Sequence, residues 1–249
     1  MLDRMLKRVV ARELPDVAPP PYEIAPGLWG LDRELGFPLG MRLPTRSFLV
    51  RLDDGGVLIL SAPPTLDDAT TEAIVELGPV RHIVAPNCFH HVFAPALSQR
   101  YPDAALWAAP GLGDRVAGFP DAHELGAEPA AAWAGVLEQV VLQSRPGVSE
   151  VLFFHRSSNT LILTDLAFNV ARYPRLVDHL VWRVSGIPRG FGPGRTSRRM
   201  LLSNRDAARE CLQRLLAWPF ERIVMAHGDP IEQDSRQRMR AAFATYLED

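Results

Sequence analysis

The chain has 249 residues, 47% of them hydrophobic and 22% charged, as expected of a globular protein with one sizeable core. Its formal net charge of −2 argues against a nucleic-acid partner, and no run approaches the ~20 apolar residues that span a bilayer. Two cysteines far apart in sequence, Cys88 and Cys211, leave a single disulfide open but are more typical of a reducing compartment. Because the first residues also lack the apolar core of a secretory signal, we expect a cytoplasmic protein.

Residues 1–14 form the first predicted unit. Apolar residues recur there at helical spacing and predict an amphipathic helix over residues 1–13 with a basic polar face. The basic face permits binding to a membrane surface, whereas the apolar face permits packing on the domain or on a second subunit of a homo-oligomer. We expect packing, without stable membrane insertion, because one short basic helix anchors weakly. Residues 15–21 contain four prolines and predict a stiff linker.

Residues 22–249 are predicted to form one domain of alternating strands and helices. Apolar runs and period-two patterns predict strands at 28–31, 47–52, 57–61, 81–85, 105–108, 136–143, 149–154, 160–164 and 222–225. Helical spacing predicts helices at 65–77, 94–100, 111–116, 176–184, 204–216 and 234–247. The turn sequence at 53–56 predicts a hairpin, as does that at 156–159, and the Gly-, Pro- and Arg-rich residues 187–199 predict a long loop.

The order of these elements predicts the fold class. Strands followed by a helix, and then strands followed by helices, indicate two mixed β-sheets packed face to face with helices outside, a four-layer αββα sandwich. A doubly wound fold would carry a glycine-rich turn after its first strand, and none is present.

Three predicted strands lead into short segments that contain side chains of the types that bind metals. His90 and His91 follow strand 81–85, Asp165 follows strand 160–164, and His227 follows strand 222–225. Functional side chains commonly gather at strand ends in folds with this layering. Imidazole and carboxylate together suit zinc, iron or manganese. We therefore expect His90, His91, Asp165 and His227 to converge on one divalent metal ion.

This order of hairpin, helix, histidine pair, second hairpin ending in Asp165, and late strand ending in His227 resembles the metallo-β-lactamase superfamily over about residues 22–249. The family's His-x-His-x-Asp-His motif falls on residues 86–91. There, Pro86 and Cys88 replace the first two histidines, His90 replaces the aspartate, and His91 is kept. The histidine that usually follows a Pro-Gly pair is replaced by Val148.

The resemblance implies that the first metal position is lost and that the second survives. A single ion, most simply zinc, would then be held by His90, His91, Asp165 and His227. The implied activity is metal-assisted hydrolysis of an ester, thioester, lactone or phosphoester, with Asp165 and His227 as catalytic residues. Four protein ligands would close a tetrahedral zinc site, however, so catalysis would need either five-coordination or one of the four ligands away from the metal.

Two other functions stay open. The cluster could be a metal-free relic in a non-catalytic binding or scaffold protein, or an iron-centred redox site. Among the remaining residues, Cys88 is expected not to be a ligand, and His155, at the tip of the second hairpin, is expected at the surface. Asp229 is interpreted as orienting His227 or as a solvated loop acid. Arg189, Arg195, Arg198 and Arg199 of the long loop are interpreted either as binding an anionic small-molecule substrate or, as is more common, as solvated loop charges.

Overall fold

The computed structural model describes residues 19–36, 42–113, 116, 119, 121–171, 176–184 and 186–248. The predicted helix at 1–13 and most of the predicted linker at 15–21 lie outside the described residues, and so does part of the helix predicted at 111–116.

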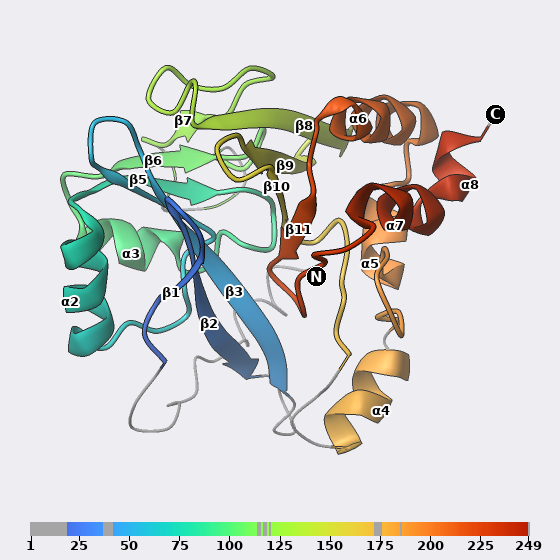
Figure 1. The fold of residues 1–249 in the computed structure, drawn as a ribbon, viewed down its shortest axis with the longest axis horizontal. Helices are drawn as coiled ribbons and strands as arrows, with labels where there is room; N and C mark the ends of the chain where they lie inside the picture. Colours follow the sequence, from blue (N-terminus) through green and yellow to red (C-terminus); the bar gives the residue numbers. More distant parts are fainter. Residues whose placement is uncertain are drawn as a thin grey trace.

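The first seven strands form one mixed sheet whose spatial order follows the sequence (Figure 1). They are β1 (Tyr22–Ala25), β2 (Leu28–Gly36), β3 (Arg42–Arg51), β4 (Val57–Leu60), β5 (Val80–Ala85), β6 (Ala105–Ala108) and β7 (His123–Glu124). Strands β1 to β4 pair antiparallel, and β4 to β7 pair parallel. The predicted hairpin at 53–56 joins β3 to β4, where Gly55 takes the positive φ of 79° that the turn requires.

The second sheet has four strands in the order β11-β10-β9-β8. They are β8 (Leu137–Arg145), β9 (Val148–His155), β10 (Thr160–Leu163) and β11 (Arg222–Met225). The predicted second hairpin pairs β9 with β10 antiparallel. Strands β10 and β11 are parallel and in register, with Leu163 opposite Met225. Their carboxyl ends therefore reach the same edge of the sheet.

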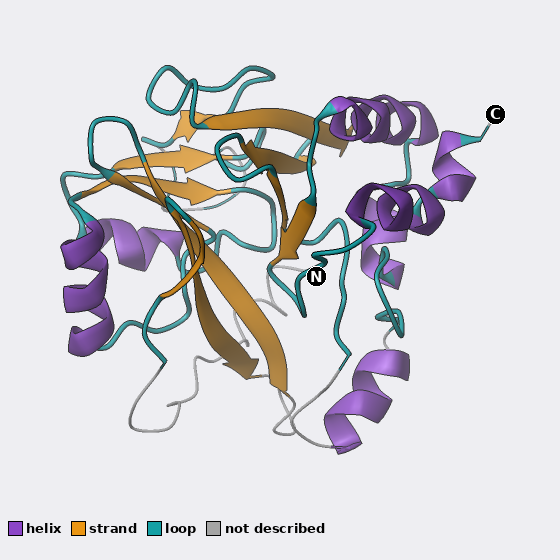
Figure 2. Ribbon diagram, viewed as in Figure 1, coloured by secondary structure: helices purple, strands orange, loops and turns teal. Residues whose placement is uncertain are grey.

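The core has three layers because most strands are apolar on both faces. Between the sheets, Phe153, Ile162 and Val224 pack with Phe48 and Leu58. On the outer face of the four-stranded sheet, the alternate strand residues pack against α6 (Arg205–Ala217), α7 (Ser235–Ala242) and α8 (Ala244–Leu247). The seven-stranded sheet is covered by α2 (Asp68–Leu77) and α3 (Ala94–Arg100) (Figures 1 and 2). The predicted αββα sandwich of two mixed sheets is confirmed.

The strands predicted at 28–31 and 47–52 are longer in the structure, where they are β2 and β3. Three predictions about helices are also corrected. Helix α2 begins at Asp68, not residue 65, because the Asp67 carboxylate accepts the Thr70 amide and caps the helix. The predicted loop at 187–199 ends in a short helix, α5 (Arg195–Met200). The helix predicted at 234–247 is two helices separated at Phe243, whose ring is fully buried against the sheet. Helix α4 (Leu176–Val184) matches its prediction.

The prediction that His155 lies at the surface is wrong. Its side chain ends β9 with 1% exposure, and its Nδ1 lies 2.7 Å from Ser158 Oγ. Burial lowers the pKa of this histidine from 6.5 to about 4. Both cysteines are free thiols. None of the described helices is long and apolar enough to cross a bilayer.

His155 should make the stability of the domain depend on pH. The unfolded chain takes up a proton at this histidine near pH 6.5, and the folded chain only near pH 4. The stability it contributes is therefore present above pH 6.5 and lost as the pH falls to about 4, a change of about 2–3 kcal/mol. In urea titrations, His155→Gln should lose less stability than wild type between pH 7.5 and 4.5. The exposed His123 provides the control, since His123→Gln should keep the wild-type dependence. Equal pH dependence in wild type and His155→Gln would contradict the prediction.

Candidate metal centre

Three loops that follow β5, β10 and β11 bring a cluster of ligand-type side chains to one rim of the sandwich. The ligand atoms of His90, Asp165 and His227 all lie within 4.8 Å of one another. His90 Nε2 lies 3.3 Å from Asp165 Oδ2 and 3.2 Å from His227 Nε2. His227 Nε2 lies 3.5 Å from Asp165 Oδ1. These side chains are only 7, 13 and 3% exposed, respectively, so the cluster is largely shielded from water.

His227 is held in one tautomer. Its Nδ1 lies 2.8 Å from the carbonyl oxygen of Pro44 in β3. A carbonyl can only accept, so Nδ1 carries a hydrogen, and Nε2 is the nitrogen that faces the cluster and that would bind a metal ion. The ring of Phe168 stacks on the imidazole, with centroids 5.2 Å apart and planes 9° from parallel.

His90 is oriented from two sides. Its Nδ1 lies 2.6 Å from Ser61 Oγ, and its backbone amide donates to Asn87 Oδ1. Ser61, directly after β4, has a φ of 63°. A non-glycine residue in this left-handed region costs on the order of 1–3 kcal/mol. The strained residue is thus the same serine whose hydroxyl contacts His90.

Asn87 is a site residue that the sequence interpretation missed. It is fully buried, and its Nδ2 donates to Asp165 Oδ2 at 2.8 Å and to Thr164 Oγ1 at 2.9 Å. Its Oδ1 accepts the amides of Phe89 and His90. Asn87 thus connects the β5 loop to the end of β10. An asparagine just after a strand and before a turn is a known turn former, which was the available signal.

Glu150 of β9 is the second residue that was missed. Its Oε1 accepts the Thr164 and Asp165 amides and the Thr164 hydroxyl, while its Oε2 has no partner within the described part of the chain. Burial and the nearby Asp165 charge raise the pKa of Glu150 to about 7. An acid within a strand that is mostly apolar was the signal for a buried polar role.

Asp165 shows the opposite shift. Burial alone would raise the pKa of its carboxyl, but the imidazoles of His90 and His227 outweigh burial and hold the pKa well below its usual range. The cluster therefore contains one ionised carboxylate at neutral pH.

The structure brings together three of the four predicted ligands. His91 is not a member of the cluster; it is 6% exposed, and its ring centroid lies 6.0 Å from that of Phe119. Adjacent residues of a turn project in different directions, so only one of the two histidines points to Asp165. Cys88 is also outside this group of three residues. Asp229 hydrogen-bonds to Asn169 through its backbone amide and carbonyl.

The donor set fits a divalent ion. Two imidazole nitrogens and one carboxylate are hard-to-borderline ligands that suit zinc, iron or manganese. Three protein ligands leave a coordination position open, as catalytic zinc sites do, which removes the difficulty that four predicted ligands posed. The Nδ1–H of His227 on a backbone carbonyl is the usual second contact of a metal-binding histidine.

Comparison with models of protein families shows the family to which the chain belongs. The model of a family described as "Domain of unknown function (DUF4336)" matches residues 26–183. The chain belongs to the DUF4336 family. No curated protein sequence matches it.

Solved structures show that this DUF4336 member has the metallo-β-lactamase fold. The metallo-β-lactamase from Pontibacter korlensis has a TM-score of 0.62 at 14% identity, covering 90% of this chain and 98% of the other. The metallo-β-lactamase FIM-1 from Pseudomonas aeruginosa, in a mono-zinc form, has a TM-score of 0.58 at 12% identity, covering 92% and 98%. A putative diflavin flavoprotein fragment from Nostoc sp. PCC 7120 has a TM-score of 0.60 at 14% identity, covering 91% and 94%.

Proposed function

We propose that this chain is a mononuclear metal-dependent hydrolase of an ester, thioester, lactone or phosphoester. The observation that carries the proposal is the convergence of His90, Asp165 and His227, each oriented by its own hydrogen-bond partner. Preorganised ligands favour metal binding because little conformational entropy is lost when the ion enters. The mono-zinc form of FIM-1, which shares the fold, supports a stoichiometry of one ion.

Each cluster residue has a distinct task in this proposal. A bound divalent ion supplies a Lewis acid that polarises the substrate and lowers the pKa of a coordinated water. Asp165 contributes the anionic ligand, and the bond from Asn87 to its Oδ2 keeps the carboxylate from rotating. His90 and His227 contribute neutral nitrogens. The low exposure of all three side chains strengthens their electrostatic interactions, because water screens them little.

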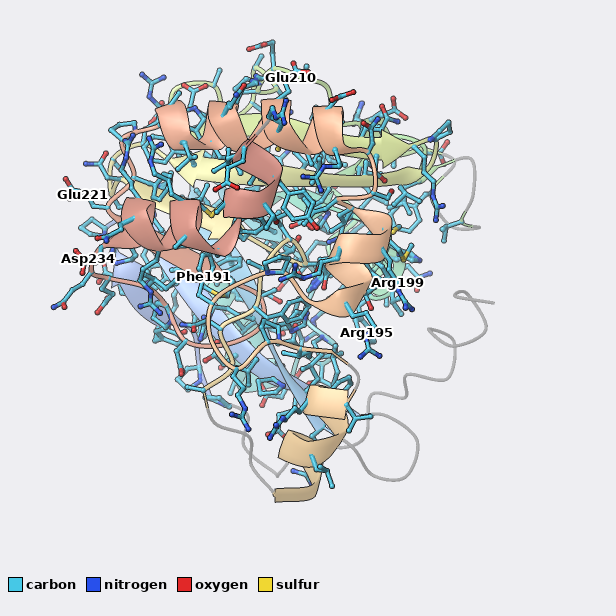
Figure 3. All side chains as sticks on the ribbon, turned by 90° about the vertical axis from the view of Figure 1, so that its right-hand side faces the viewer. Phe191, Arg195, Arg199, Glu210, Glu221 and Asp234 are labelled. Carbon is cyan, nitrogen blue, oxygen red and sulfur yellow. The ribbon has the colours of Figure 1, made fainter. Side chains whose placement is uncertain are left out.

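We also propose that the small-molecule substrate is anionic. Helix α5 contacts the site directly, because Ser197 Oγ donates to the Asp165 carbonyl oxygen at 2.5 Å. Arg195 and Arg199 lie two residues before and two residues after Ser197 on this helix, and both are exposed (Figure 3). Guanidinium groups bind carboxylates and phosphates through paired hydrogen bonds. Substrate screens should therefore include anionic esters and phosphoesters beside neutral ones.

Metal content and thermal melting test the proposal. Protein purified without a histidine tag should contain about one equivalent of metal, because the site offers one set of three ligands. Added zinc should raise the melting temperature, since a ligand that binds only the folded state must stabilise it. Manganese and iron are tested in parallel, and preferential binding of iron would favour a redox role. If none of the three metals changes the melting temperature, the non-catalytic scaffold alternative is favoured.

A further inference from the structure

We infer that Arg46 of β3 is a positioning residue for His227, acting across the two sheets. The inference rests on the proposed metal site and names a residue outside its ligands. Arg46 lies on the seven-stranded sheet, whereas His227 follows β11 of the four-stranded sheet. The hydrogen bonds from the Arg46 side chain reach Met225 and Gly228, on either side of His227 and 179 and 182 positions away in sequence.

Arg46 hydrogen-bonds to three carbonyl groups around His227. Its backbone amide donates to Ala226 O at 2.7 Å. Its Nη1 donates to Met225 O at 3.2 Å and to Gly228 O at 3.0 Å. The residues on both sides of His227 are therefore attached to one strand of the opposite sheet. Two residues before Arg46, the Pro44 carbonyl accepts the His227 Nδ1 hydrogen.

The guanidinium is itself held in place. Nε donates to Asp32 Oδ1 at 2.7 Å and Nη2 donates to Asp32 Oδ2 at 3.0 Å, the paired geometry that only arginine offers. The Tyr22 ring lies 5.9 Å from the guanidinium carbon and adds a cation–π contact. With Nε and Nη2 on Asp32, Nη1 has one fixed direction, toward the two carbonyls.

This arrangement explains why a charged group is retained in a nearly buried place. The Arg46 side chain is 10% exposed, and burying a charge is unfavourable unless it is paired and hydrogen-bonded. Apolar packing would stabilise the sheet contact equally well, but it would leave the Met225 and Gly228 carbonyls without their donor. The role of Arg46 is therefore to fix the turn after β11, so that the imidazole of His227 points to the cluster.

Arg33 provides a matched control. It lies on the neighbouring strand β2, is also buried, and donates to Thr65 O, Pro19 O, Asp32 O and Thr70 Oγ1. Its bonds lead to α2 and the start of the domain, away from β11. Loss of Arg33 should lower stability through the same kind of polar network without touching the turn that carries His227.

The test compares Arg46→Met, Arg46→Lys and Arg33→Met. Arg46→Met should raise the zinc dissociation constant about 10- to 100-fold, the usual effect of removing support behind a metal ligand. Arg46→Lys should fall between Arg46→Met and wild type, because an ammonium group cannot hold Asp32 and both carbonyls together. Arg33→Met should melt at a lower temperature with an unchanged zinc affinity. Equal zinc affinity in wild type and Arg46→Met would overturn the inference.

A second readout does not require metal. Nitrogen-15 NMR of the metal-free protein reports which imidazole nitrogen of His227 carries the hydrogen. Wild type and Arg33→Met should show the Nδ1–H tautomer alone, and Arg46→Met should show a mixture. If wild type binds no zinc, the proposed function fails, but the tautomer comparison still decides the role of Arg46. If Arg46→Met does not fold, the Asp32→Asn variant is measured in its place. The Asp32 side chain is 44% exposed, so removing its charge should destabilise the protein less than removing the buried guanidinium.

Discussion

Replacing Asp165 with asparagine should abolish high-affinity metal binding, with a loss of more than about 100-fold in the zinc affinity. Losses of 10- to 100-fold follow removal of groups that merely support a ligand, and Asp165 is itself a ligand in the proposed site. It is also the only anionic member of the cluster. In the variant, the two neutral imidazoles of His90 and His227 would have to bind a dication without a negative charge to balance it. Metal analysis and zinc-dependent melting of purified Asp165→Asn measure the effect.

Two substitutions nearby serve as controls for Asp165→Asn. Cys88→Ser should keep the metal, because Cys88 is not a member of the cluster. Asp229→Asn should also keep it, because Asp229 contacts Asn169 through its backbone groups, which the substitution leaves intact. Equal zinc affinity in wild type and Asp165→Asn would show that the carboxylate is not a ligand. The cluster would then be a hydrogen-bonded relic, in which removal of a buried charge can even stabilise the fold.

Replacing Gly228 with alanine should produce the largest loss of stability among single substitutions near the site. Gly228 has a φ of +117°, and an added Cβ would lie 2.3 Å from the carbonyl carbon and oxygen of Asn169. It would also lie 2.7 Å from the Val170 amide nitrogen. These are backbone atoms, so the clash can be relieved only by separating the two loops. We expect the free energy of unfolding to fall by about 4 kcal/mol or more.

Substitutions at two other glycines separate the two contributions to the loss of stability, which are the strain of a positive φ and the clash of the added Cβ. Gly55 has a φ of +79° with nothing within 4 Å of an added Cβ, so Gly55→Ala should cost only the backbone strain, about 1–2 kcal/mol. Gly190 has neither a positive φ nor a near neighbour, so Gly190→Ala should be close to neutral. Urea denaturation of the three variants provides the comparison. A Gly228→Ala protein as stable as Gly55→Ala would show that the loops separate without penalty.

Local patterns in the sequence were sufficient for the architecture. Strands such as β10 and β11 are short apolar runs between turn residues, and these runs are recognisable because both faces of the strand are buried. The turn at 53–56 predicted its hairpin because Gly55 needs a positive φ. Ligand-type residues in the segments that follow strands also identified His90, Asp165 and His227, since strand ends in a layered fold meet at a common rim.

Only the tertiary structure decided which side chains complete the site. Nothing in the pair His90–His91 says which ring faces Asp165, because the direction of a turn residue depends on what packs beneath it. The bonds from Asn87 to Asp165 and from Arg46 to Gly228 join residues 78 and 182 positions apart. Such contacts depend on how two sheets stack, and no local periodicity encodes them. His155 was misplaced for the same reason: a hairpin end looks exposed in sequence, but here the turn between β1 and β2 brings Gly27 next to the His155 ring.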